Sequence, residues 1–130
     1  MTSNTSFLRT VLMLDAVASG ATGLLLIVGA GLLEPWLSLP VALMRTAGFI
    51  LVPYVAFVAF VGTRETISRS AVGLIIAVNI VWALASFGLL MSSYVAPSAL
   101  GYAFVAAQAI VVAALGVLQY VGLNRDPVAA

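Results

Sequence analysis

Four long apolar segments, separated by short connections, constrain this chain more than any other feature. Each segment is about twenty residues long or slightly longer, enough for a helix to cross a bilayer. They span residues 7–30, 41–62, 71–91 and 98–122. Pro35 and Pro40, in the first connection, are expected to stop the flanking helices. An apolar segment in lipid must satisfy its own backbone hydrogen bonds, and four segments are too few for a closed barrel. The sequence therefore predicts an all-α integral membrane four-helix bundle, residues 1–130 forming a single domain.

The composition excludes several classes of function. Of 130 residues, 64% are hydrophobic and 7% are charged, whereas about 25% are charged in soluble domains. The sequence has no cysteine or histidine, which removes thiolate nucleophiles, disulfides and the usual zinc and haem ligands. It has no lysine and only five scattered arginines, a pattern that argues against nucleic-acid binding. We expect a non-enzymatic protein surrounded by lipid, with no cofactor and no metal.

The arginines predict the orientation in the membrane. Arg9, Arg64, Arg69 and Arg125 lie at the side shared by the two termini and the middle connection, and only Arg45 lies toward the other side. Positively charged residues concentrate in cytoplasmic segments. The first apolar run is longer than that of a cleaved signal peptide, so we expect it to be retained. The prediction is a multi-pass protein of the bacterial inner (cytoplasmic) membrane with cytoplasmic N- and C-termini.

The two halves of the chain show an ordered similarity. The stretch "LDAVASGATGLLL" from Leu14 aligns with "VNIVWALASFGLL" from Val78, which places Asp15 opposite Asn79. The endings "VGTRE" and "VGLNRD" also correspond. Apolar sequences resemble one another easily, so two interpretations stay open: chance similarity, or a parallel duplication with repeats 7–65 and 71–126.

Polar residues follow one face on each of two predicted spans. Asp15, Ser19 and Thr22 are at helical spacing on the first span. The third span carries the same kind of face, formed by Asn79, Trp82 and Ser86. Because polar groups are costly in lipid, these faces are expected to point inward. We therefore expect the first span to pack directly on the third.

Asp15 is the most informative of these residues. An ionised aspartate near the bilayer centre costs on the order of 3 kcal/mol or more. We expect Asp15 to be protonated, or paired with donors such as the Asn79 amide and the Trp82 indole, with Gln108 of the fourth span able to join. The candidate proton or ligand site is therefore Asp15, Asn79, Trp82 and Gln108, supported by the polar face of Ser19, Thr22 and Ser86.

Two functions compete for this cluster. Asp15 could fix helix packing in a structural or accessory membrane protein of unknown role, which is our leading interpretation. Alternatively, it could be the protonatable residue of an oligomeric, proton-coupled transporter or channel for a small molecule or cation. The aromatic stripe of Tyr54, Phe57 and Phe60 is expected to contact the core or lipid. The small residues Ala99, Ala103 and Ala107 favour close packing in the bundle or between subunits, consistent with a homo-oligomer or a larger complex.

A resemblance over nearly the whole chain rests on three motifs: "LDAVASGATGLLL", "GLLEPWLSLPVALMR" and "SALGYAFVAAQAIVVAALGVLQYVGL". In them the chain resembles a group of small four-span inner-membrane proteins of proteobacteria, a resemblance to which no function is attached. In size, and in having an acid on its first helix, the chain is also similar to small multidrug-resistance transporters. The acid of that family is a glutamate where this chain has Asp15, and the rest of the family's pattern is not matched.

Overall fold

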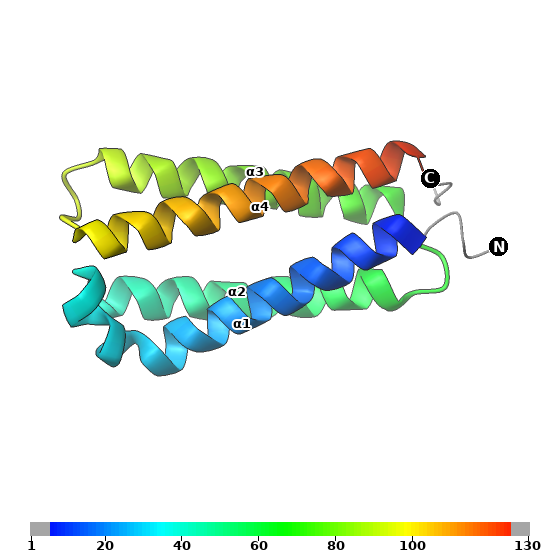
Figure 1. Ribbon diagram of the computed structural model, residues 1–130. Coiled ribbons are helices and arrows are strands. Elements are labelled where there is room, and N and C mark those ends of the chain that lie inside the picture. The colour runs from blue at the N-terminus through cyan, green and yellow to red at the C-terminus, as the bar shows by residue number, and fades with distance from the viewer. Residues whose placement is uncertain (1–5, 126–130) are drawn as a thin grey trace.

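The protein is a bundle of four antiparallel helices. The computed structural model describes residues 6–125, which form α1 (Ser6–Leu37), α2 (Val41–Thr63), α3 (Arg69–Met91) and α4 (Ala99–Arg125). Figure 1 shows two hairpins, α1–α2 and α3–α4, lying side by side. One end of the bundle, here called the terminal end, contains the start of α1, the end of α4 and the α2–α3 connection. The other end, here called the hairpin end, contains the turns within the two hairpins. The all-α four-helix bundle is confirmed.

The outer faces of the helices are apolar. Each helix is long and apolar enough to cross a membrane. Large apolar side chains point outward, including Val28, Leu32 and Val81, which are 72%, 79% and 64% exposed. Helices that are apolar on all sides belong either in a large protein core or in lipid. A bundle of 130 residues has no such core for its outer faces, so this is a multi-pass membrane protein.

The order of the helices around the bundle follows the chain. α1 packs most extensively on α2 and also contacts α4; α3 packs on α4, and α2 touches α3 only sparsely. The prediction that the first span packs directly on the third is wrong, because α1 and α3 occupy opposite corners. Short connections make consecutive helices antiparallel neighbours. Polar side chains of α1 and α3 meet by reaching across the centre.

Two apolar clusters fill the bundle near its ends. The cluster at the terminal end is built around Leu8, Leu12, Val58 and Ile75. The cluster at the hairpin end is built around Leu26, Met44, Leu90 and Val105. Buried polar side chains lie in the section between them: Asp15, Ser19, Asn79 and Gln119. The centre of the bundle is therefore its polar part.

Pro35 does not stop the first helix. α1 continues through it to Leu37 and ends where Ser38 adopts a left-handed conformation with φ 55°, its N–H bonding to the carbonyl of Glu34. Proline lacks an N–H and disturbs the preceding turn, and Figure 1 shows the last turns of α1 changing direction. The redirected end meets α4, where the Ser98 backbone N–H donates to the carbonyl of Leu37 at 3.1 Å. The proline therefore bends the helix and closes the hairpin end.

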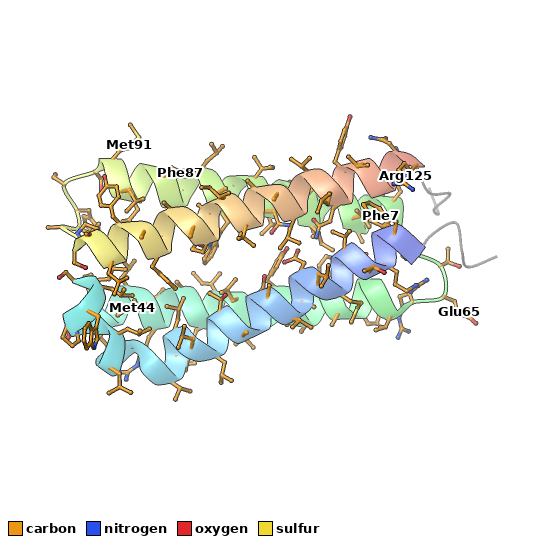
Figure 2. All side chains as sticks on the ribbon, viewed as in Figure 1. Phe7, Met44, Glu65, Phe87, Met91 and Arg125 are labelled. Carbon is orange, nitrogen blue, oxygen red and sulfur yellow. The ribbon has the colours of Figure 1, made fainter. Side chains whose placement is uncertain are left out.

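Arginine side chains hold the terminal end together. Arg9 of α1 donates to the carbonyls of Gly62 and Arg64 at 2.6 and 2.7 Å. Arg69 of α3 donates to the carbonyl of Leu123 at 3.2 Å. Figure 2 shows Arg125 beside Phe7 at this end, with the guanidinium 4.8 Å from the ring centre. Each hairpin thus has an arginine on its first helix bonding the end of its second. The duplication of 7–65 and 71–126 stays a prediction.

Candidate functional site

The side chain of Asp15 lies fully buried at the centre of the bundle, with 0% of its surface exposed. Its Oδ1 accepts a hydrogen bond from Ser19 Oγ at 2.8 Å. Its Oδ2 accepts from Asn79 Nδ2 at 3.1 Å and from Gln119 Nε2 at 2.8 Å, and the Tyr54 hydroxyl lies 2.6 Å away. These five residues form what we call the Asp15 network. In residues 6–125, every buried side-chain nitrogen or oxygen has a hydrogen-bond partner.

All four helices contribute to the Asp15 network. Asp15 and Ser19 are one turn apart on α1, and Tyr54, Asn79 and Gln119 come from α2, α3 and α4. A Cβ at Gly116 would lie only 3.3 Å from the Cβ of Asn79, so a glycine lets α4 approach α3 closely. Gln119, almost one turn farther on, thereby reaches Asn79 Nδ2 with its Oε1 at 2.9 Å. Three residues of the α1–α2 hairpin therefore meet two residues of the α3–α4 hairpin at the centre of the bundle.

A second polar cluster lies beside the first. The indole N–H of Trp82 donates to Gln108 Oε1 at 2.9 Å. Gln108 Nε2 donates to Ser86 Oγ at 3.0 Å and to the carbonyl of Val105 at 2.8 Å. Ser86 in turn donates to the carbonyl of Trp82 at 2.8 Å. This Trp82 cluster joins α3 to α4 within one hairpin.

The candidate residues therefore fall into two groups. Asp15 and Asn79 bond to each other, with Ser19 beside them. The second group is Trp82, Gln108 and Ser86, in which the Trp82 indole donates to Gln108 and Gln108 donates to Ser86. Thr22 donates to the carbonyl of Ala18 on its own helix. The structure places Asp15 and Asn79 in one cluster and Trp82 and Gln108 in an adjacent one. That all four act together as one functional site stays a hypothesis.

Sequence reasoning missed two members of the Asp15 network. Tyr54 was expected to contact core or lipid as part of an aromatic stripe, yet its hydroxyl points at Asp15. Gln119 lies near the predicted end of the last span, where an amide could reach the interface. The structure extends α4 to Arg125 and buries Gln119 completely. The available signal was chemical: a buried carboxyl needs several donors, and hydroxyl and amide groups at similar depth can supply them.

Cavities adjoin both clusters. One of about 280 Å³ lies between the hairpins and is bordered by Ser19, Thr22, Trp82, Phe104 and Gln108 among its lining residues. A neighbouring cavity of about 100 Å³ shares all of these except Ser19. Ser19 is thus the contact between the larger cavity and the Asp15 network. The arrangement can accept a small, mostly apolar molecule next to a buried carboxyl.

Gln108→Leu is expected to shift Trp82 fluorescence to shorter wavelength, because the indole N–H loses its acceptor in an apolar setting. The measurement uses a Trp36→Phe background, which leaves Trp82 as the only tryptophan. Gln119→Leu is the matched control, being the same substitution on the same helix but in the Asp15 network. Equal shifts in the two variants would contradict the division into two clusters.

Fold and site together define a multi-pass helical membrane protein with a buried, fully bonded carboxyl at the joint between two hairpins. Comparison of the chain with protein-family models, curated proteins and solved structures finds no match. The function has to be inferred from the site itself.

Proposed function

We propose that this chain is a non-enzymatic structural or accessory protein of a membrane complex, with the Asp15 network as the device that holds its two hairpins in one arrangement. The observation that supports this is the use of Asp15: groups from all four helices surround it and leave it 0% exposed. Hydrogen bonds between helices stabilise a defined packing inside a membrane. By fixing the packing of the helices, such a network keeps the outer surface of a structural protein in one shape.

The outer surface offers a place for a partner. Ala99, Ala103 and Ala107 follow one face of α4, and all three are exposed. The bundle itself therefore leaves this small-residue face uncovered, where another helix can approach closely. The proposed partner is a second copy of the chain or another membrane subunit.

The proposed location is the bacterial inner membrane with both termini in the cytoplasm. Arg9, Arg64, Arg69 and Arg125 all belong to the terminal end of the bundle, and Arg45 lies near the start of α2 at the other end. This asymmetry supports a cytoplasmic terminal end by the positive-inside rule.

A second candidate function is an oligomeric, proton-coupled transporter or channel. The cavity of about 280 Å³ favours it, because Ser19 both lines the cavity and bonds to Asp15. A small molecule or cation in the cavity would lie next to the network and could respond to its protonation. Asp15 would then be the coupling residue.

Proteoliposomes containing a pH-sensitive dye distinguish the two candidates. An accessory protein is expected to leave proton flux at the level of empty liposomes, with and without a gradient of the lipophilic cation tetraphenylphosphonium. Proton movement that depends on the cation and is lost in a folded Asp15→Asn variant would favour the transporter instead. Glu34→Gln is the matched control, since Glu34 is an exposed acid on the same helix.

The accessory function also predicts that the chain is part of a larger complex. In its native membrane, a tagged copy expressed at its normal level is expected to migrate on a native gel in a complex heavier than the 13.4 kDa chain. Migration solely as a monomer would contradict a role in an assembly.

A further inference from the structure

The Tyr54 hydroxyl lies between two oxygen atoms that both require a hydrogen. Its oxygen is 2.6 Å from Asp15 Oδ2 and 2.8 Å from Asn79 Oδ1, both hydrogen-bond distances. A tyrosine hydroxyl carries one hydrogen and can donate to only one acceptor at a time. If Asp15 is ionised, one of these two oxygen–oxygen contacts has no hydrogen in it.

The amide orientations do not supply the missing hydrogen. Asn79 Nδ2 uses its two hydrogens on Asp15 Oδ2 and Gln119 Oε1, at 3.1 and 2.9 Å. Reversing the Asn79 amide would let it donate to Tyr54, but would place its oxygen 3.1 Å from the Asp15 carboxylate. Either orientation leaves an ionised Asp15 network one hydrogen short.

We infer that Asp15 and Tyr54 form a proton-binding site, in which a proton on Asp15 Oδ2 completes the network. The carboxyl O–H then donates to the Tyr54 oxygen, and the Tyr54 O–H donates to Asn79 Oδ1. Asp15 Oδ2 still accepts from the Asn79 and Gln119 amides, as a hydroxyl oxygen can. Loss of the proton turns the Tyr54 hydrogen toward Asp15 and leaves Asn79 Oδ1 without a donor.

No cation among the described residues faces Asp15. The groups that face it are Ser19 from α1, Tyr54 from α2, Asn79 from α3 and Gln119 from α4. Tyr54 is the only titratable group among them, and none carries a positive charge at neutral pH. An unpaired charge inside a membrane is expensive, whereas a hydrogen-bonded carboxylic acid is not.

Arg9, the arginine of α1, bonds to backbone groups at the terminal end of the bundle. Arg9 donates to the backbone carbonyls of Gly62, Arg64 and Glu65 at the terminal end. The apolar cluster containing Leu12, Val58 and Ile75 lies on that side of the network. The larger cavity borders the network at Ser19, and a small cavity of about 40 Å³ borders it at Ser19, Tyr54 and Asn79, whereas Asp15 itself is 0% exposed.

Infrared spectroscopy of the full-length protein in lipid nanodiscs tests this inference. The chain contains only two aspartates, Asp15 and Asp126, so carboxyl-¹³C aspartate labelling of an Asp126→Asn variant isolates Asp15. The expected result near neutral pH is the C=O band of a protonated acid, absent after Asp15→Asn. Labelled Asp15 showing only carboxylate bands in the folded protein would overturn the inference.

Tyr54→Phe tests whether Tyr54 shares the proton. The Asp15 band is expected to move because its O–H loses its acceptor, whereas Tyr102→Phe should leave it unchanged, since Tyr102 donates to the carbonyl of Leu90. If Tyr54→Phe folds and the Asp15 band does not move, the inference that Tyr54 shares the proton is overturned. Should that variant not fold, Ser19→Ala supplies the test of the bonding geometry. It removes the donor to Oδ1, so the C=O band should rise in frequency, and an unchanged band would contradict a proton on Oδ2.

Discussion

Replacing Asp15 with leucine is expected to lower the free energy of unfolding of the bundle by about 3 kcal/mol. Ser19, Asn79 and Gln119 each lose a hydrogen-bond acceptor and remain buried at the centre of the bundle. A buried donor left unpaired costs more than a hydrogen bond contributes on average. Reversible unfolding by SDS in mixed micelles, followed by circular dichroism, measures the loss.

Two controls separate the network from the substitution itself. Asp15→Asn keeps an oxygen that can accept from Ser19 and an amide that can donate to Tyr54, but its nitrogen cannot accept from Asn79 and Gln119. Its loss should therefore be smaller than that of Asp15→Leu and should stay below about 3 kcal/mol. Glu34→Leu removes an exposed acid from the same helix and should change stability by no more than about 0.5 kcal/mol. Equal stability of Asp15→Leu and Glu34→Leu would show that the network does not hold the hairpins together.

Gly48→Ala is expected to cost about 2 kcal/mol, because α1 and α2 approach each other too closely at this point for a methyl group. A Cβ at Gly48 would lie 2.7 Å from the Cγ1 of Ile27, 2.8 Å from the carbonyl oxygen of Gly23 and 3.1 Å from the Ile27 nitrogen. Two of these atoms belong to the backbone of α1 and cannot rotate away. The helices must separate, which loosens the most extensively packed pair in the bundle.

Gly73→Ala is the matched comparison for this prediction. A Cβ at Gly73, in α3, would meet no atom within 4 Å. Alanine is the better helix former, so this variant should gain roughly 0.5 kcal/mol. The same unfolding measurement applies to both glycines, and a loss of similar size in both would refute the close contact between α1 and α2.

The length and polarity of the chain were sufficient to predict the fold class. Each span had to be helical because lipid offers no hydrogen-bond partner to the backbone. The same argument marked Asp15 and Asn79 as inward-facing, and both are buried. It could not locate the helix ends, because α1 continues through Pro35 to Leu37, and α4 continues to Arg125, past the predicted end at 122.

The sequence by itself determined four membrane-spanning helices and a buried acid near their centre, because both follow from the cost of placing backbone and charge in lipid. Only the tertiary structure decided which side chains meet that acid. Helical spacing gives the face on which a residue lies, but not the neighbour that the face meets. Here α1 and α3 stand at opposite corners, so contact with Asp15 depends on which side chains reach the centre. Tyr54 and Gln119 do so, while the indole of Trp82 bonds to Gln108 within its own hairpin.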